Sequence, residues 1–189
     1  DGRFVLSGTG EMKDYSGSNN SPYYNYKESI KTVEIQNEVT SIGNYAFENC
    51  KSITSIEIAS SVTSIGNEAF AYCTNLTSIE IPSGVTSIEN YAFSNCTSLN
   101  SINVDKDNQS YSSEDGILFD KEKKKLITYP AGKKEKEYNI PSSVTSIGAG
   151  TFYGCRSLTR IEIPSSVTSI ECLAFYGCTS LTSIEIPSS

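Results

Sequence analysis

The sequence predicts a repeat solenoid, mostly β, built from units of 23 residues. The unit is clearest between Leu76 and Ser98, which read LTSIEIPSGVTSIENYAFSNCTS. Similar segments begin at Ile30, Ile53, Leu76, Glu135 and Leu158, with a shortened one at Leu181 and a longer, divergent one at Leu99. A period of roughly 20 to 50 residues is typical of proteins in which each unit packs only on its two neighbours.

Each unit contains two predicted strands and one turn of helix. The segment SIEIP at residues 78–82 alternates isoleucine with polar residues, which indicates a strand with one buried face that ends at the proline. The segment VTSI at residues 85–88 predicts a second, short extended piece. Ala92, Phe93 and Cys96 have the spacing of one helical turn with an inward face. Stacking then predicts three inward columns: Ile56, Ile79, Ile102, Ile161 and Ile184; Phe47, Phe70, Phe93, Phe152 and Phe175; Cys50, Cys73, Cys96, Cys155 and Cys178.

Residues 1–29 lie outside the repeat and are predicted to form the N-terminal cap of the solenoid, with residues 30–189 forming the array. The first coil of a solenoid has an apolar face that must be covered. The side chains expected to cover it are Phe4, Leu6, Met12, Tyr23, Tyr24 and Tyr26. Alternatively the tyrosine cluster is a binding patch, because tyrosine is favoured at interfaces.

The enlarged unit at residues 99–134 is predicted to contain a hairpin. The apolar segments GILFD and LITYP flank the charged segment DKEKKK, a pattern typical of two strands joined by a charged tip. Its candidate binding residues are Lys123, Lys124, Lys125, Lys133 and Lys134. They could recognise an acidic protein or a sulfated glycan. The alternative is a solvated hairpin whose charges keep an additional strand edge soluble.

The same unit carries an acidic segment at residues 105–116 that superficially suggests a calcium loop. An EF-hand loop needs glycine at its sixth position and a carboxylate at its twelfth. Counted from Asp105, these positions hold Ser110 and Gly116. The sequence therefore does not favour calcium in this segment.

The cysteines predict neither a zinc site nor a disulfide framework. Five of the six share one repeat position, and no close pair such as C-x2-C occurs. We expect a column of buried free thiols, because parallel side chains in successive coils rarely have the dihedral angle that a disulfide requires. Cys172 occupies the position of Asn44 in the first unit, and a local bridge to Cys178 is an alternative.

A column of mainly acidic residues is predicted on the outward side of the strands. It consists of Glu34, Glu57, Glu80, Asn103, Asn139, Glu162 and Glu185. Carboxylates stacked about 5 Å apart in water repel each other by about 0.8 kcal/mol per pair. The column is therefore a candidate site for a basic partner or cations. The alternative is that duplication copied a solubilising glutamate and that salt screens the repulsion.

Charge and composition exclude several classes of function. The net charge is −7, and residues 121–137 hold seven lysines and three glutamates, so the rest of the chain carries −7 − 4 = −11. An acidic body does not suit nucleic acid. The chain has no histidine, no readable nucleophile–base pair and no phosphate-binding glycine loop, so we do not expect an enzyme or a cofactor. No run of 18 apolar residues predicts a membrane span.

The IEIP strand, the VTSI segment and the AF-x-x-C close, from Ile79 to Cys96, resemble the BspA-like class of leucine-rich repeats. The resemblance extends over about residues 30–189. It implies a right-handed solenoid with one parallel sheet on its concave face. It also implies a secreted or cell-surface protein that binds an extracellular or host-surface protein, often as an adhesin. This family has no general catalytic, metal or ligand residues to carry over.

Two other functions remain open at this point. One is an extracellular carbohydrate-binding module, in which exposed tyrosines rather than glutamates would supply the affinity. The other is a structural spacer that displays another domain, which predicts no partner for this segment.

Overall fold

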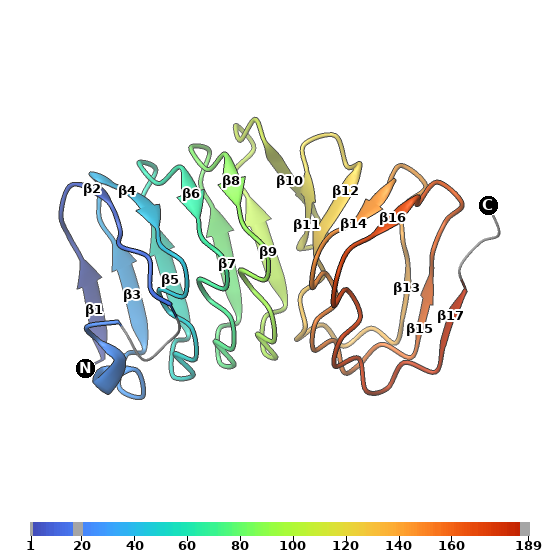
Figure 1. Ribbon diagram of the computed structural model, residues 1–189, viewed down its shortest axis with the longest axis horizontal. Helices are drawn as coiled ribbons and strands as arrows, with labels where there is room; N and C mark the ends of the chain where they lie inside the picture. The colour runs from blue at the N-terminus through green and yellow to red at the C-terminus, as the bar shows by residue number, and fades with distance from the viewer. Residues whose placement is uncertain (1, 17–20, 186–189) are drawn as a thin grey trace.

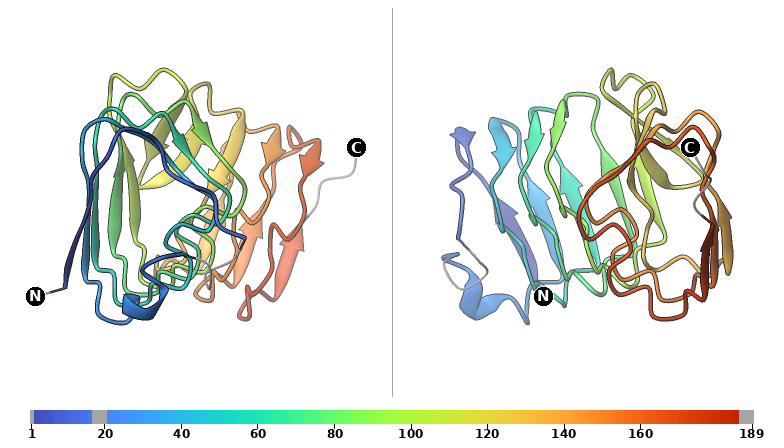
Figure 2. Two further views of the ribbon diagram at one scale, coloured as in Figure 1. Left: turned by 60° about the vertical axis from the view of Figure 1, so that its left-hand side comes forward. Right: turned by 45° about the vertical axis from the view of Figure 1, so that its right-hand side comes forward.

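Successive coils of the chain stack along one axis, with strands on two faces of the coil (Figures 1 and 2). This computed structural model describes residues 2–16 and 21–185. The first strand face carries β1 (Arg3–Leu6), β3 (Thr32–Ile35), β5 (Ser55–Ile58), β7 (Ser78–Ile81), β9 (Ser101–Val104), β13 (Glu137–Asn139), β15 (Arg160–Glu162) and β17 (Ser183–Glu185). The second strand face carries β2 (Gly10–Glu11), β4 (Val39–Ile42), β6 (Ser64–Ile65), β8 (Ser87–Ile88), β10 (Tyr111–Glu114), β11 (Ile117–Asp120), β12 (Lys125–Thr128), β14 (Ser146–Ile147) and β16 (Ser169–Ile170).

The repeat register confirms the predicted solenoid. Strands of successive regular units pair in parallel with equivalent residues opposite each other, as Ile79 lies opposite Ile102 and Ile161 opposite Ile184. The sheet arrangement differs from the single sheet that was expected. The VTSI segments form their own ladders on the second face, and the first face is divided into β1-β3-β5, β7-β9 and β13-β15-β17. The second face exists because every unit turns after its first strand, which places each VTSI segment beside its copy.

The predicted helical turn around Phe93 is wrong, because residues 90–95 form successive turns. The only helix in the described residues is the 3-10 helix η2 (Tyr24–Tyr26). Two residues four positions apart have left-handed backbone in these turns, as Tyr91 (φ 60°) and Asn95 (φ 55°) do. Left-handed residues interrupt the dihedral repeat of an α-helix. The turns bond to the next coil instead, as when Phe70 N–H donates to Ala92 O at 2.9 Å.

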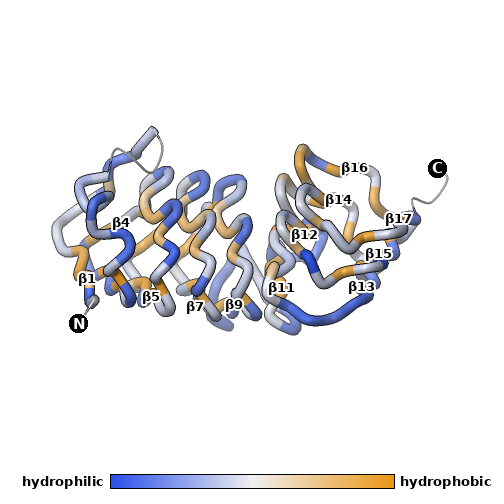
Figure 3. Tube along the Cα trace, turned by 90° about the horizontal axis from the view of Figure 1, so that it is seen from below, coloured by the Kyte–Doolittle hydropathy of each residue, from blue (hydrophilic) through white to orange (hydrophobic). Residues whose placement is uncertain are grey.

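Hydrophobic segments recur from coil to coil along the chain (Figure 3), and their buried side chains form the core. The rings of Phe47, Phe70 and Phe93 stack at centroid distances of 5.6 and 5.8 Å with interplanar angles of 4° and 8°. A second stack joins Tyr129, Phe152 and Phe175. The buried side chains form two clusters, and the enlarged unit contributes residues to both. The enlarged unit therefore divides the solenoid into a first stack, β1 to β9, and a second stack, β12 to β17.

The predicted hairpin is confirmed, and it is one strand larger than expected. β11 pairs antiparallel with both β10 and β12, and β12 pairs in parallel with β14 of the next coil. β11 lies between the two cores: Leu118 belongs to the first cluster, whereas Ile117 and Phe119 belong to the second. A strand buried on both faces needs a continuous apolar run, which the sequence ILF supplies.

Asn108 comes from the acidic segment that superficially suggests calcium, yet its side chain is fully buried. Its Nδ2 donates to the carbonyls of Pro82 (2.8 Å) and Val85 (3.0 Å). Its Oδ1 accepts from the backbone N–H groups of Ser110 (2.9 Å) and Tyr111 (2.8 Å). The Asn108 carboxamide thus donates hydrogen bonds to two backbone carbonyls at the end of the first stack. It does so at the place where the next regular coil is displaced.

The N-terminal segment packs as expected on the first coil. β1 pairs in parallel with β3, and Phe4, Leu6 and Met12 pack on the first cluster. Of the three tyrosines, only Tyr23 is buried: its ring stacks on Phe47 at 5.3 Å, and its hydroxyl donates to Ala46 O. Residues 1, 17–20 and 186–189 lie outside the described residues, and the boundary between residues 29 and 30 stays a prediction.

Replacing Tyr111 by phenylalanine is expected to lower the free energy of unfolding by about 1–3 kcal/mol, the usual effect of leaving a buried donor unpaired. The Tyr111 hydroxyl accepts a hydrogen bond from the Ile88 N–H at 2.8 Å. In the earlier coils, the strand at the position of Ile88 pairs instead with the equivalent strand of the following coil. Urea unfolding of Tyr111→Phe measures the loss. Tyr26→Phe, at a ring that is 64% exposed, is the control and should be neutral. Equal stability of both variants would contradict this role of the Tyr111 hydroxyl.

Candidate binding surfaces

The acidic column lies on the exposed side of the first strand face. The strand register places Glu34 opposite Glu57, Glu80 opposite Asn103, and Glu162 opposite Asn139 on one side and Glu185 on the other. All seven side chains are exposed except that of Glu34, which is half-buried. Alternation along each strand produces this, because the neighbouring isoleucines point into the core.

The column is not continuous over the whole chain. β9 and β13 are not paired, and β9 lies against the inserted strand β11, where Ile102 N–H donates to Gly116 O at 2.8 Å. The structure therefore brings the seven predicted residues together as two groups. One runs from Glu34 to Asn103 on the first stack, and the other from Asn139 to Glu185 on the second.

Arginines compensate the charge at both ends of the column. The Arg3 guanidinium binds Glu34, and this hydrogen bond, together with one from Gln36, lowers the pKa of the Glu34 carboxyl. Arg160 Nη2 lies 3.9 Å from Glu162 and 3.4 Å from Glu185.

Glu57 and Glu80 form no salt bridge within residues 2–16 and 21–185. Glu57 and Glu34 also line an open hollow of about 480 Å³ at the ends of β3 and β5. Arg3, which binds Glu34, also interacts electrostatically with Glu57. The central part of the column is consequently the part in which the described residues form no salt bridge.

The five candidate lysines do not form one basic patch. Lys123 pairs with Glu114 at 2.9 Å, Lys125 with Glu171 at 2.5 Å, and Lys133 with Glu135 at 3.4 Å. The Lys133 side chain is only 12% exposed, and its ammonium lies 6.0 Å from the centre of the Tyr129 ring. Lys124 and Lys134 are exposed. Acidic side chains of the protein therefore pair with three of the five candidate lysines.

A partly enclosed cavity of about 300 Å³ lies where the two stacks meet, and sequence reasoning did not anticipate it. We call it the junction cavity. Its walls come from residues 86–94 of the first stack, from Ser110, Tyr111 and Asp120 of the insertion, and from residues 125–128 and 148–150 of the second stack. Repeat periodicity could not predict this cavity, because it forms only where the period is broken.

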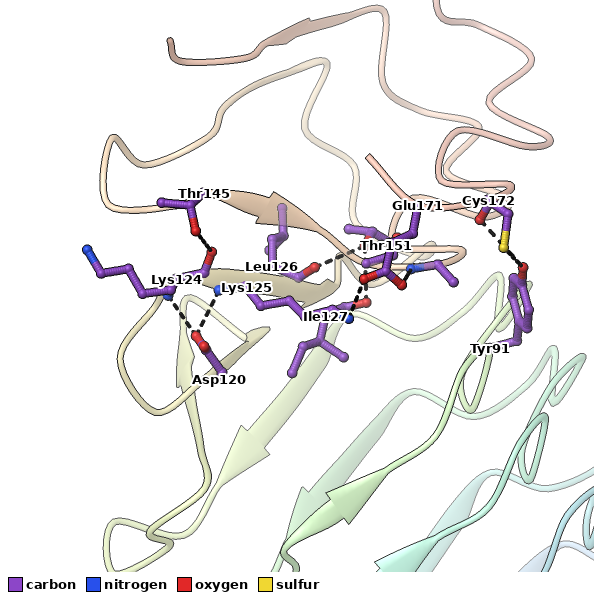
Figure 4. A network of polar contacts seen from close by, with 12 residues as sticks. Tyr91, Asp120, Lys124, Lys125, Leu126, Ile127, Thr145, Thr151, Glu171 and Cys172 are labelled. Carbon is purple, nitrogen blue, oxygen red and sulfur yellow. Dashed lines mark hydrogen bonds and ion pairs between the residues drawn. The ribbon is translucent and has the colours of Figure 1, made fainter. Parts of the chain in front are cut away.

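Charged side chains around the junction cavity already form hydrogen bonds or ion pairs within the protein (Figure 4). Asp120 Oδ1 accepts from the backbone N–H groups of Lys124 (2.7 Å) and Lys125 (2.9 Å), which closes the tip of the hairpin. Glu171 receives the Lys125 ammonium on one oxygen and the Ala149 N–H (3.1 Å) on the other. These contacts fix β12 to the two coils that follow it.

Two side-chain contacts join the turns of the two stacks across 81 residues of sequence. The hydroxyls of Tyr72 and Tyr153 lie 2.9 Å apart, and the Tyr91 hydroxyl lies 2.8 Å from Cys172 Sγ. The contact with Cys172 raises the pKa of Tyr91 to about 12. Cys172 is exposed and forms no disulfide. Its contact with Tyr91 joins the second stack to the first.

All six cysteines are free, so the alternative bridge between Cys172 and Cys178 is not formed. Each thiol of the column from the second unit onward reaches a carbonyl of the preceding coil: Cys73 Sγ contacts Phe47 O (3.3 Å), Cys96 contacts Phe70 O (3.1 Å), Cys155 contacts Tyr129 O (3.5 Å) and Cys178 contacts Phe152 O (3.0 Å). Burial raises the pKa of Cys50 and of Cys96 to about 12.

Within 2–16 and 21–185, no group of three or more His, Cys, Asp or Glu side chains could hold a metal ion. In the same residues, no helix has the length and apolar character needed to cross a membrane.

Comparison with known proteins gives one family and several structural neighbours. The family model "BspA type Leucine rich repeat region" matches in 6 copies, over residues 19–135 and 131–189. No curated protein matches the sequence.

Among solved structures, the pneumococcal vaccine antigen PcpA is 29% identical with a TM-score of 0.80, covering 84% of this chain and 40% of that one. A leucine-rich repeat protein from Eubacterium ventriosum is 28% identical with a TM-score of 0.56, covering 97% and 67%. A leucine rich cell surface protein from Faecalibacterium prausnitzii is 29% identical with a TM-score of 0.56, covering 86% and 61%. The chain thus spans less than half the length of the pneumococcal antigen.

Proposed function

Because the chain belongs to the BspA type leucine-rich repeat family, we propose that it is a non-catalytic protein of the cell surface that binds a partner protein through its first strand face. A surface location is supported by the Faecalibacterium neighbour, which is described as a leucine rich cell surface protein. A binding role, rather than catalysis, is supported by the absence of histidine and of a nucleophile–base pair in the sequence.

The observation that carries the proposal is the exposed acidic pair Glu57 and Glu80. Both side chains are exposed on β5 and β7, neighbouring strands of the first strand face, and no arginine or lysine of the described residues forms a salt bridge with either. Two neighbouring carboxylates repel each other, and a basic segment of a partner would relieve that repulsion. The open hollow beside Glu57 gives a basic side chain room to lie against the strand ends. The partner that this surface fits is therefore a protein segment rich in lysine or arginine.

Reversing both charges in Glu57→Lys/Glu80→Lys is expected to weaken binding of such a partner at least tenfold at low salt. The attraction becomes repulsion, and each close charge pair contributes several-fold to affinity. The effect should shrink as salt rises, because the screening length is about 10 Å at 0.1 M ionic strength. The measurement is surface plasmon resonance against immobilised, purified extracellular-matrix proteins, at two salt concentrations.

The matched control is Glu28→Lys/Glu122→Lys, which changes the net charge equally at exposed residues away from the strand face. It should bind nearly as the unchanged protein does. Equal weakening by both double variants would show a general charge effect and would contradict a site at Glu57 and Glu80. Absence of saturable binding to every matrix protein would contradict the proposed function itself.

A further inference from the structure

The junction cavity exposes an unpaired edge of the first stack. In the regular coils, backbone N–H groups of each turn donate to the next turn, as Glu68 does to Asn90 O (3.1 Å) and Phe70 to Ala92 O (2.9 Å). One coil later the equivalent donors are the N–H groups of Tyr91 and Phe93. Neither has an acceptor among the described residues, and both residues line the junction cavity.

Neutral polar groups complete this edge. Ile88 and Asn90 line the same wall, and the Asn90 carboxamide has no hydrogen-bond partner in the part of the chain that the structure describes. Ser110 of the insertion and Thr128 of β12 also line the cavity, and their hydroxyls have no hydrogen-bond partner among the described residues. The cavity is therefore lined by residues that supply both hydrogen-bond donors and acceptors.

Ser94 adds an unusual feature to the wall. Its side chain is 7% exposed, and its Oγ is the one buried side-chain oxygen or nitrogen without a hydrogen-bond partner in the described residues. It borders the junction cavity and a smaller hollow of about 120 Å³ beside Tyr72 and Tyr153. A buried hydroxyl without a partner is unfavourable by about 1–3 kcal/mol. The equivalent residue one coil earlier is Ala71, so the backbone at this position does not require a serine.

The charged groups at the cavity already have partners. The Lys125 ammonium binds Glu171, Asp120 Oδ1 closes the hairpin tip, and Glu89 Oε1 accepts from the Ser87 hydroxyl at 2.9 Å. A charged ligand would have to compete with these contacts. Apolar surface is also present, from Ile88, Ile127 and the Tyr91 ring. The ring is fixed by its hydroxyl contact with Cys172 and by Gly150, where an added Cβ would lie 2.5 Å from the ring.

From these observations we propose that the junction cavity binds a neutral sugar ring. Sugar hydroxyls both donate and accept, which suits the unpaired N–H groups of Tyr91 and Phe93 and the hydroxyl of Thr128, while the C–H face of the sugar packs on the Tyr91 ring. In the complex the Ser94 hydroxyl rotates about χ1 and hydrogen-bonds the ligand. A cavity of about 300 Å³ is at the lower end of small-molecule sites and holds one ring rather than a chain. The site lies apart from the acidic column and is independent of the proposed protein partner.

The test is saturation-transfer NMR with the full chain and five probes taken one at a time: glucose, galactose, mannose, N-acetylglucosamine and N-acetylgalactosamine. We expect saturable binding of at least one. Oligosaccharides ending in that sugar serve as a second arm. Binding of both forms indicates that a terminal sugar of a glycan can enter, whereas binding of the free form alone indicates a free monosaccharide as the ligand.

Thr128→Val keeps the shape of the side chain and removes its hydroxyl, so it should weaken binding about fivefold, the effect of one neutral hydrogen bond. Thr77→Val, at an exposed residue away from the cavity, is the matched control and should leave binding unchanged. Ser94→Ala should weaken binding while the free protein becomes as stable as before or more stable. A merely structural serine would instead lower stability.

Two results would overturn the proposal. One is that none of the five sugars binds saturably, which would leave the cavity filled with water only. The other is that Thr128→Val and Ser94→Ala both bind the sugar as tightly as the unchanged protein does, which would place the sugar elsewhere on the surface.

Discussion

Replacing Phe70 by alanine is expected to lower the free energy of unfolding by about 3–5 kcal/mol, as large-to-small changes of buried aromatic residues do. The Phe70 side chain is fully buried, and its ring stacks on Phe47 on one side and Phe93 on the other. Removal of the ring opens a cavity between three coils. Neither neighbouring ring can fill that cavity without losing the contacts that it makes in its own coil. Urea unfolding at pH 7 measures the loss.

The matched control is Phe175→Ala at the other end of the same column. The Phe175 ring is only partly buried and stacks on a single described ring, that of Phe152, at 5.2 Å. Its loss should be clearly smaller than that of Phe70, because fewer contacts disappear and water can fill the space. Equal losses at the two positions would mean that stacking between coils does not determine their stability.

Alkaline pH is expected to unfold the protein through its buried thiols. Burial raises the pKa of Cys50 and of Cys96 from the usual 9.0 to about 12. Above pH 9 the unfolded chain loses these protons while the folded chain keeps them, so deprotonation favours the unfolded state. Each thiol should then lower the free energy of unfolding by about 1.4 kcal/mol per pH unit between pH 9 and 12. At pH 10 the two together amount to about 3 kcal/mol.

Urea unfolding at pH 8, 9 and 10 with a reductant present measures this slope. The control is Cys50→Ala/Cys96→Ala, which removes two of the buried thiols with a raised pKa and should lose less stability over the same interval; Cys73, Cys155 and Cys178 remain in both proteins. Burial also raises the pKa of Tyr23 and of Tyr129 from the usual 10.0, which makes pH 9 to 10 the interval in which thiols dominate. Parallel slopes for the two proteins would contradict the role of the thiols.

Repetition made much of the fold readable from the sequence. Every regular unit places a phenylalanine and a cysteine at the same positions, and most place an isoleucine at a third. Stacking therefore had to align these residues in columns, and the register of Ile79 opposite Ile102 follows. The exposed position of Glu57 and Glu80 could also be predicted, because alternation along a strand fixes which side chains point outward.

The turns could not be predicted in the same way. Ala92, Phe93 and Cys96 have helical spacing, but the left-handed backbone at Tyr91 and Asn95 bends the chain so that its N–H and C=O groups reach the next coil. Backbone hydrogen bonds between coils thus replace the hydrogen bonds that a helix would form along the chain. The spacing of residues within one unit does not show which of the two kinds forms.

Sequence alone determined the solenoid, its 23-residue repeat, the buried columns and the outward side of the acidic column. The tertiary structure alone decided which of those acids are compensated, since Arg3 and Arg160 reach their partners from neighbouring strands. It also decided the junction cavity, which lies where Asn108 and Tyr111 replace the contacts of a missing coil. The physical reason is that a contact repeated between successive coils is specified by the sequence of every unit. A contact that occurs once, between segments distant in the sequence, depends on how the rest of the fold brings those segments together.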